Sequence, residues 1–420
     1  MKTPLGYAFK AKLNTITPLH IGGNGRLSPL TDYYVKDNRI NVIDNDALSS
    51  ILLDRGMTNN FVTAVEQAAS ESKETFLEEF LVNHLSMNIG QLPMQLSLSA
   101  IGVENPVLIE RFMETQGMPY IPGSSIKGAL RSALLFSWLL EEKGKKSLRS
   151  WLGNLRRQKE NLRSYSRDQL NRNRQKALKE IAKSFSKDIE EDDQCFGSIR
   201  SRSRMPLSSL VITDTSTFNR NQMAVYGVKR FNLSKGTSDI PTMKECILPD
   251  QRAEITISLG YSWRDKRTTE EHYNHFIKQL TDEEAFLRLV NQYSQAVLDY
   301  EIEASSTIET TSLSQYRDNL QNIRERIRSA VTTKAFFRLG QGKMQYYQTI
   351  AMAVLALVGN DKENTDWLFY LDYCKGFDKD STKHDIYPVT RALALPNHVP
   401  LGWVEINLHD PHSSTSSTIQ

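Results

Sequence analysis

The stretch Met118–Arg131 reads MPYIPGSSIKGALR, in which a loop punctuated by Pro and Gly runs directly into an amphipathic helix. Ser124 or Ser125 is a good N-cap, and the apolar residues that follow keep helical spacing. Lys127 and Arg131 lie four residues apart and therefore share one helix face. Backbone N–H groups at a helix start, hydroxyls and two cations together favour an anionic partner such as phosphate.

An ordinary loop before a solvent-exposed helix explains the same residues equally well, because Gly-Ser-Ser loops and helices with Lys and Arg are common. The stretch is not a Walker loop, since Ser-Ser-Ile-Lys separates Gly123 from Gly128 and no Gly-Lys-Ser/Thr follows. The pattern therefore leaves phosphate binding and plain structure open and disfavours nucleotide hydrolysis.

The composition is typical of a soluble globular protein, with 39% hydrophobic residues and no apolar run of membrane-spanning length. The N-terminus lacks the apolar stretch of a signal peptide, so we expect a cytoplasmic location and no membrane partner. Cys195, Cys246 and Cys374 are scattered without a Cys-x-x-Cys pair, which argues against a disulfide framework and a zinc ribbon. We expect no cofactor and no metal.

The net charge of +3 hides a strongly basic block, because residues 143–183 contain fourteen Lys or Arg against three Asp or Glu. This block, at +11, is attracted to phosphate backbones, and the rest of the chain totals −8. It is either a helical insertion that contacts RNA or another subunit, or a solvated helix that exposes its charge. The acidic run of residues 188–193 follows directly and supplies an opposite pole.

Hydrophobic spacing predicts strands that alternate with helices along the chain. In the first half we expect a strand at 9–13, a hairpin of 33–35 with 40–43, helices at 46–54, 60–85 and 124–142, and a strand at 209–215. In the second half we expect strands at 224–233, 253–259 and 336–339 and helices at 270–300, 313–329 and 346–357.

Ile121–Arg131 (IPGSSIKGALR) resembles the signature of the RAMP superfamily of CRISPR-associated RNA-binding proteins. Residues 17–23 (TPLHIGG) and 28–35 (SPLTDYYV) are similar to the opening of the fifth-subunit family of type III-A (Csm) CRISPR complexes. Residues 338–343 (RLGQGK) resemble the late glycine-rich loop of the superfamily. Weaker similarity extends over Phe196-Gly197, LVITD at 210–214, PVTR at 388–391 and PLGW at 400–403.

The resemblance implies an α+β fold of RAMP architecture, with two ferredoxin-like (RRM-like) domains that face each other across an RNA groove. We place the N-terminal domain at 1–217, with helical insertions that include the basic segment 143–187. The C-terminal domain then covers 218–411, and the Ser/Thr-rich tail 412–420 is predicted to be disordered.

The same resemblance implies a non-catalytic subunit that binds the guide RNA (crRNA), caps its 3′-end side in a type III-A interference complex and supports crRNA maturation. Its expected partners are crRNA, the repeated backbone RAMP subunit, host nucleases that trim crRNA and, indirectly, target RNA. The residues expected to bind RNA, mainly through the backbone, are His20, Gly22, Gly23, Arg26, Gly123, Ser124, Ser125, Lys127, Arg131, Lys229, Arg230, Arg338, Gly340, Gln341, Gly342 and Lys343.

Catalysis is not expected from the glycine loop near the N-terminus. The backbone subunit cleaves target RNA with an aspartate two residues before a proline, and aligning that proline with Pro29 puts Leu27 at the aspartate position. A leucine can neither bind a metal ion nor transfer a proton. Asp32, the nearest carboxylate, is better explained by turn or strand-edge structure.

Two other readings remain open from the sequence. His20 could serve as the general acid or base of a metal-independent crRNA-processing endoribonuclease, although a packed histidine beside a glycine turn is the commoner arrangement. Alternatively, the chain is a protein-only scaffold in which RNA contact is incidental. His272 and His275 have the spacing of a metal site, but no third ligand is in view.

Overall fold

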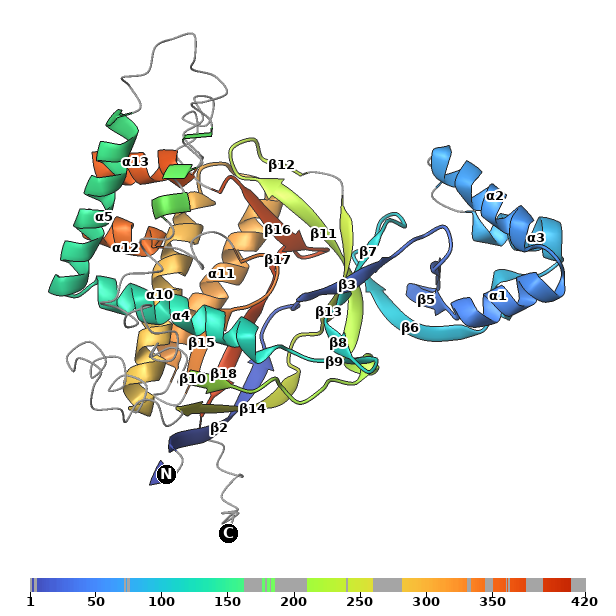
Figure 1. The fold of residues 1–420 in the computed structure, drawn as a ribbon, viewed down its shortest axis with the longest axis horizontal. Helices are drawn as coiled ribbons and strands as arrows, with labels where there is room; N and C mark the ends of the chain where they lie inside the picture. Colours follow the sequence, from blue (N-terminus) through green and yellow to red (C-terminus); the bar gives the residue numbers. More distant parts are fainter. Residues whose placement is uncertain are drawn as a thin grey trace, which may run out of the picture.

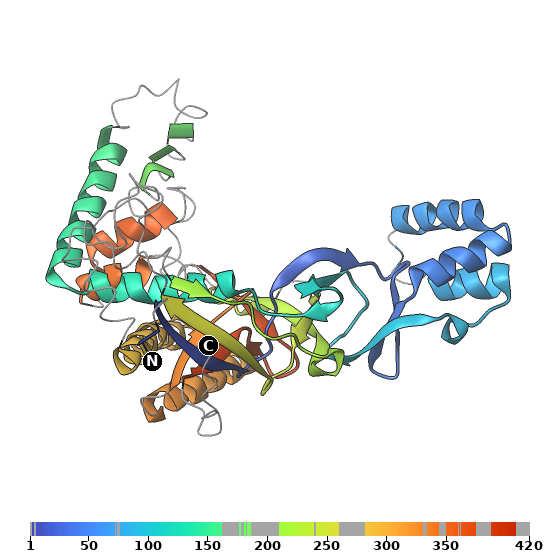
Figure 2. The ribbon, with the colours of Figure 1, turned by 60° about the horizontal axis from the view of Figure 1, so that its bottom comes forward.

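The protein folds into an elongated α+β structure in which a helical body, a central sheet and a protruding lobe follow one another along the long axis (Figures 1 and 2). The computed structural model describes residues 2–3, 6–71, 73, 76–161, 176–177, 180–181, 183–185, 210–238, 241–259, 282–330, 334–343, 350–359, 361, 363–374 and 388–408. Among these residues, no helix has the length and apolar character that crossing a membrane requires.

The first sheet has the strand order β10-β14-β2-β18-β15, and all neighbours along this path are antiparallel. Its strands are β10 (Leu210–Ile212), β14 (Arg252–Leu259), β2 (Gly6–Thr15), β18 (Trp403–Asn407) and β15 (Lys334–Arg338), with β1 (Lys2–Thr3) paired to β2. Leu13 of β2 lies opposite Ala253 on one side and Ile406 on the other, and all three are buried. The alternation of apolar residues in β2 and β14 thus builds the centre of this sheet.

The second sheet has the order β3-β7-β13-β11-β6-β5-β4 and mixes antiparallel with parallel pairs, the latter being β7 with β13 and β6 with β11. Its strands are β3 (Gly22–Leu27), β7 (Ile109–Phe112), β13 (Thr242–Ile247), β11 (Met223–Asn232), β6 (Met94–Ile101), β5 (Arg39–Ile43) and β4 (Tyr33–Lys36). Shorter strands, β12 (Thr237–Ser238), β16 (Thr390–Ala394) and β17 (Val399–Pro400), extend it beside β11. A separate hairpin joins β8 (Glu114–Thr115) to β9 (Met118–Pro119).

Helices of the body cover the first sheet (Figure 1). Here α4 packs beside β10, α10 packs beside β15, and the two helices contact each other, so both lie on one face of the sheet. The body helices are α4 (Gly123–Leu139), α5 (Glu142–Asn161), α10 (Glu283–Ala304), α11 (Thr311–Ser329), α12 (Ala351–Leu357) and α13 (Thr365–Cys374), with a short 3-10 turn η4 (Arg220–Gln222) near the second sheet.

The lobe at the far end contains α1 (Asn45–Asp54), α2 (Thr58–Ser70), α3 (Leu77–Leu85) and the 3-10 turn η1 (Ile89–Gln91). It has a small hydrophobic core of its own, separate from the main core. The hairpin of β4 with β5 and the long strand β6 connect the lobe to the second sheet (Figure 1).

The α+β class and most expected elements are confirmed, including the strand at 9–13, the hairpin of 33–35 with 40–43 and the helix at 313–329. The single helix expected at 60–85 is wrong, because α2 ends at Ser70 and α3 begins only at Leu77. Residues 270–281, 346–349, 188–193 and 412–420, together with Phe196-Gly197 and most of the basic block beyond residue 161, lie outside the described residues.

The expected division at residue 217 does not follow the sheets. In the first sheet, β2 from the beginning of the chain lies between β14 and β18 from its second half. In the second sheet, β7 pairs with β13, and β6 pairs with β11. Strand pairing therefore interleaves the two halves, which a boundary drawn along the sequence does not represent.

Candidate nucleic-acid interface

The start of helix α4 is built by a close approach to β10. A Cβ atom at Gly123 would come within 2.2 Å of the Ile212 carbonyl oxygen, so only glycine fits here. The Gly123 N–H donates to Asp214 Oδ1 at 2.8 Å. The expectation that Ser124 or Ser125 caps the helix is wrong, because Pro122 is the N-cap residue and a carboxylate from the segment after β10 accepts from the first N–H.

The exposed stripe of α4 carries the predicted cations. Ser124 and Gly128 are exposed, and Lys127 and Arg131 are half-buried on the same side, whereas the opposite side is buried in the core. Partial burial lowers the pKa of Lys127. Because these residues follow each other at helical spacing, a polyanion lying along α4 would meet both cations in succession.

The late glycine-rich loop lies directly against the N-terminal loop, although more than 300 residues separate them. Gly340 has φ +66°, and a Cβ at this position would come within 2.1 Å of the His20 carbonyl oxygen. The same oxygen accepts from the Gln341 N–H at 2.8 Å. Lys343, which ends the loop, is half-buried, and burial lowers its pKa.

A chain of main-chain hydrogen bonds connects these two loops to the approach of α4. The Met113 N–H donates to the Ile21 carbonyl at 2.8 Å, and the Tyr120 N–H donates to the Met113 carbonyl at 3.3 Å. Tyr120 immediately precedes the IPGSS segment. The structure thus brings the three loops that the sequence singled out, at 20–23, 121–125 and 338–343, into one connected row.

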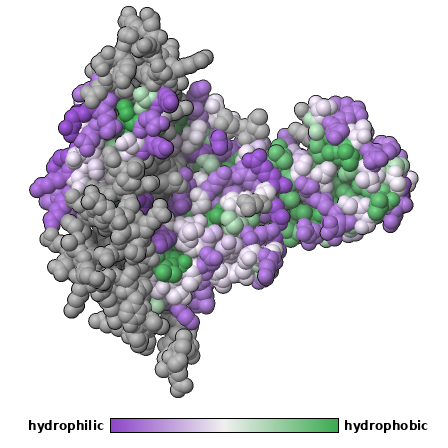
Figure 3. All heavy atoms as spheres, viewed as in Figure 1, coloured by the Kyte–Doolittle hydropathy of each residue, from purple (hydrophilic) through white to green (hydrophobic). Residues whose placement is uncertain are grey.

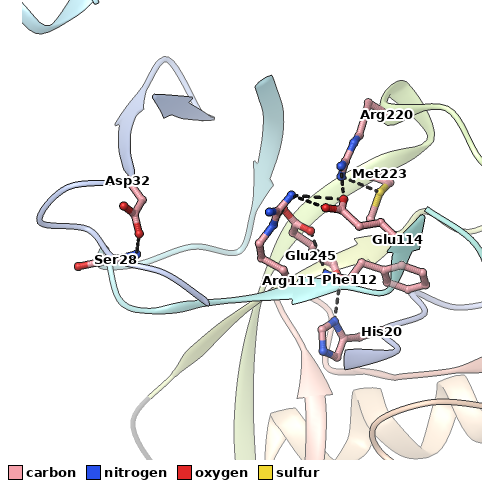
Figure 4. A network of polar contacts seen from close by, with 9 residues as sticks. All are labelled: His20, Ser28, Asp32, Arg111, Phe112, Glu114, Arg220, Met223 and Glu245. Atoms are coloured by element: carbon pink, nitrogen blue, oxygen red, sulfur yellow. Dashed lines mark hydrogen bonds and ion pairs between the residues drawn. The ribbon is translucent and has the colours of Figure 1, made fainter. Parts of the chain in front are cut away.

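His20 is fully buried at 0% exposure, and its ring lies beside Phe112 and the main chain of Glu245 (Figure 4). Its Nδ1 lies 2.7 Å from the Glu245 carbonyl oxygen, which can only accept, so Nδ1 carries a proton. Its Nε2 lies 3.6 Å from Glu110 Oε2, and Lys244 Nζ lies 2.6 Å from the same oxygen. His20 and Lys244 lower the pKa of the Glu110 carboxyl to about 2.

Further charged residues, which the sequence analysis did not single out, gather around β7 and β13 (Figure 4). Arg111 lies on β7 and Glu245 on β13, whereas Glu114 belongs to β8 and Arg220 to η4. Glu245 has no exposed surface and accepts from the Phe112 N–H at 2.9 Å; burial raises its pKa. Glu114 forms ion pairs with both Arg111 and Arg220. The side chains of Arg111 and Arg220 remain about one quarter exposed.

Arg111 and Arg220 lack a sequence signal of their own. The apolar positions Ile109 and Phe112 mark β7, but Arg220 reaches Glu114 only because the chain folds back over more than 100 residues.

Arg338 is not at the surface, contrary to its expected role in RNA binding. It is 2% exposed, donates through Nε to the Leu401 carbonyl at 2.7 Å and pairs with the buried Glu301 at 3.4 Å. These contacts orient the strand that delivers the late glycine-rich loop. We therefore remove Arg338 and His20 from the proposed contact surface and treat both as supports for the loops.

The remaining expected contacts are distributed over the second sheet. Gly22 and Arg26 are exposed on the edge strand β3, with Gly23 half-buried between them. Lys229 and Arg230 lie on β11, separated from β7 by β13, and Lys229 pairs with Glu104 at 2.7 Å.

Asp32 is a turn residue. Its carboxylate accepts from the Ser28 N–H at 2.8 Å and from the Thr31 hydroxyl at 2.9 Å. Within the described parts of the chain, no group of three or more His, Cys, Asp or Glu is arranged to hold a metal ion. His272 and His275 lie outside those parts.

The chain belongs to the RAMP superfamily, whose family model matches residues 12–343. A curated relative from Methanocaldococcus jannaschii, "CRISPR system Cms protein Csm5", is 22% identical over 96% of this chain and 90% of the relative.

Two solved structures share the fold. One is a chain of the "Csm-crRNA-target RNA ternary complex in type III-A CRISPR-Cas system", with a TM-score of 0.65, 23% identity and coverage of 95% of this chain and 100% of that one. The other is T. onnurineus Csm5, with a TM-score of 0.62, 22% identity and coverage of 94% and 99%.

Proposed function

We propose that the protein is a non-catalytic guide-RNA-binding subunit of a type III-A CRISPR (Csm) interference complex. It caps the 3′-end side of the crRNA, adjoins the repeated backbone RAMP subunit and supports crRNA maturation by host nucleases. The observation that carries the proposal is the connected row of three loops. The proposal is also supported by relatives that match nearly the whole length of the chain. These relatives are Csm5 proteins and a chain of a Csm-crRNA-target RNA complex.

The chemistry of the row favours phosphate contacts over reading of bases. Lys127 and Arg131 follow the start of α4, and Arg26 is exposed on β3. Arg111, on the strand paired with β3, and Arg220 are also partly exposed. Contacts of this kind hold the backbone and carry little sequence information. We therefore expect guide RNAs of different spacer sequence to bind with similar affinity.

The buried position of His20 weighs against the cleavage alternative. A general acid or base must come within hydrogen-bond reach of the reacting group, and the His20 ring is covered on all sides. Leu27 at the position of the catalytic aspartate of backbone subunits supports the same conclusion. Binding without cleavage is therefore the function that we propose.

The decisive experiment measures affinity for end-labelled repeat-spacer RNA at several salt concentrations, with and without Mg²⁺. Replacing Lys127 and Arg131 by alanine should weaken binding about tenfold near physiological salt and reduce the salt slope by about two, because each phosphate-contacting cation contributes about one. Denaturing gels of the same samples should show intact RNA.

The matched control is the pair Lys36→Ala and Lys235→Ala, exposed cations that lie on β4, at the opposite edge of the second sheet from β3, and in the turn after β11. Unchanged affinity and slope in the Lys127 and Arg131 variant would remove both residues from the site. Discrete RNA fragments that disappear in a His20→Ala protein would instead establish the processing enzyme, and absence of RNA binding would establish the protein-only scaffold.

A further inference from the structure

The lobe carries a helix whose apolar side is only partly covered. Met57, Phe61 and Val65 repeat every four residues along α2, and all three are half-buried. Of the thirteen residues of α2, Ala68 alone is buried, whereas the adjacent α3 buries Leu77, Phe80, Leu81 and Leu85. An amphipathic helix normally buries its apolar stripe against a neighbour. The α2 stripe packs against the core of the lobe, where the Phe61 ring lies 5.8 Å from the Phe76 ring and 5.1 Å from the Phe80 ring, but its side chains keep part of their surface exposed.

Two more exposed apolar side chains lie on the helices of the lobe. Leu53, in the last turn of α1, is 72% exposed, and Val62, next to Phe61 on α2, is 50% exposed. Hydrophobic surface is visible on the lobe (Figure 3), and Figures 1 and 2 show that no described helix or strand of the body lies beside α1, α2 or α3. We call Leu53, Met57, Phe61, Val62 and Val65 the α2 face. Exposed apolar side chains on a protruding lobe are a feature of interaction sites.

The charge around the α2 face favours a basic protein over RNA as its occupant. Residues 44–93 contain eight Asp or Glu and two Lys or Arg, a formal charge of −6 in a chain whose total is +3. Asp54 directly follows Leu53, and Glu66 lies one turn after Val62; both are exposed. Phosphates would be repelled at this rim, whereas Lys and Arg would be attracted.

We propose that the α2 face docks a protein subunit that presents an apolar centre surrounded by Lys and Arg. An apolar centre with a polar, charge-complementary rim is the usual construction of a protein–protein interface. The inference rests on the proposed function in one respect, namely that the chain is part of a multi-subunit assembly. It gives the molecule two separate surfaces, the row of loops for RNA and the acidic lobe for protein.

The test separates these two surfaces in the full chain. One variant carries Leu53→Ser with Val62→Ser, and a second carries Asp54→Lys with Glu66→Lys; all four side chains are exposed, so the fold should be retained. Each variant is co-expressed with a tagged backbone RAMP subunit and crRNA of the same system. Recovery in the purified complex should fall about tenfold in both variants. The affinity of the isolated chain for repeat-spacer RNA should stay within about twofold of the unmodified protein.

The control is Leu368→Ser on α13, an apolar side chain that is 44% exposed and lies in the body. Normal recovery of both lobe variants overturns the docking proposal, and it leaves the proposed function intact if the Lys127 and Arg131 variant still loses RNA. Reduced RNA affinity of the Leu53 and Val62 variant shows that the face binds RNA instead. A concentration-dependent dimer of the isolated chain that this variant abolishes identifies a second copy as the occupant.

Discussion

At the scale of single residues, His20 and Arg338 illustrate how burial decides what a side chain does. Both have functional groups that suit RNA chemistry, and both lie in motifs that resemble those of RNA-binding proteins. The fold places each of them under a loop, with carbonyl oxygens at 2.7 Å as partners. Buried polar groups are normally hydrogen-bonded, and these two bonds connect each side chain to the main chain of another segment. The two residues therefore hold the loops in place.

Glu110 provides a test of this supporting network through pH. Its pKa is about 2 in the folded protein, below the ordinary value of 4.5, so the unfolded chain takes up the proton first as the pH falls. The stability that Glu110 contributes is therefore complete above about pH 4.5 and is lost as the pH decreases toward 2. In urea titrations between pH 5.5 and 3.5, Glu110→Gln should be less stable at the upper pH and lose less stability on acidification.

The matched control for this titration is Glu79→Gln, which removes an exposed carboxyl from α3 in the lobe. It should follow the pH profile of the unmodified protein. A Glu110→Gln profile that runs parallel to the unmodified one would show that the carboxyl does not titrate abnormally.

Gly340 tests the contact between the late loop and the N-terminal loop. Gly340→Ala adds a Cβ at φ +66° and 2.1 Å from the His20 oxygen, so backbone has to move. The expected loss is about 2 kcal/mol or more of unfolding free energy, together with weaker RNA binding. Gly153→Ala in α5 meets nothing within 4 Å and should stabilise by about 0.5–1 kcal/mol. Thermal unfolding and RNA titration measure both, and equal stability of the two variants would contradict the packing argument.

At the scale of elements, the basic helix α5 is held by α13. Arg156 pairs with Asp366, Lys159 pairs with Asp372, and both cations lie 5.2 Å from the centre of the Phe369 ring. Part of the basic block is therefore neutralised within the protein. The sequence alone does not show this, because α5 and α13 are more than 200 residues apart.

The pairing predicts that the acidic residues of α13 limit RNA binding. Asp366→Asn with Asp372→Asn should raise affinity for RNA and steepen the salt slope by up to about two, since two cations lose their internal partners. The stability loss should stay near 1 kcal/mol, because the pairs are partly exposed. Glu363→Gln with Glu79→Gln, which removes two exposed carboxyls outside α13, controls for the change in net charge. Affinities that match this control would mean that α5 does not face RNA.

At the scale of the whole molecule, the interleaved sheets make the two halves of the chain depend on each other. β2 forms backbone hydrogen bonds with β14 on one side and β18 on the other, so removing residues 218–411 exposes both of its edges. An unpaired central strand loses its hydrogen-bond partners and exposes apolar surface.

We therefore expect the fragment 1–217 to remain unfolded or to aggregate when it is produced alone. Near-ultraviolet circular dichroism and sedimentation of the fragment measure this, and co-expression with 218–420 should restore a soluble complex. A monomeric fragment that unfolds cooperatively would restore the sequential domain boundary.

The sequence by itself determined most of the elements and the family. The helices predicted at 46–54 and 313–329 follow from local spacing of apolar residues, and the segments at 17–23, 121–131 and 338–343 already resembled the RAMP superfamily. Helix and strand formation depends on neighbouring residues, and the family resemblance depends on short motifs. Both can therefore be recognised from the sequence without knowledge of tertiary contacts.

Only the tertiary structure decided which residues meet and which are accessible. The contact of Gly340 with His20, the capping of Gly123 by Asp214 and the joint ion pairs of Glu114 all connect distant segments. The tertiary structure also buries His20 and Arg338, so that these side chains support the loops and do not lie at the surface. The physical reason is that strand pairing and burial depend on contacts between segments hundreds of residues apart, and local sequence patterns carry no information about those contacts.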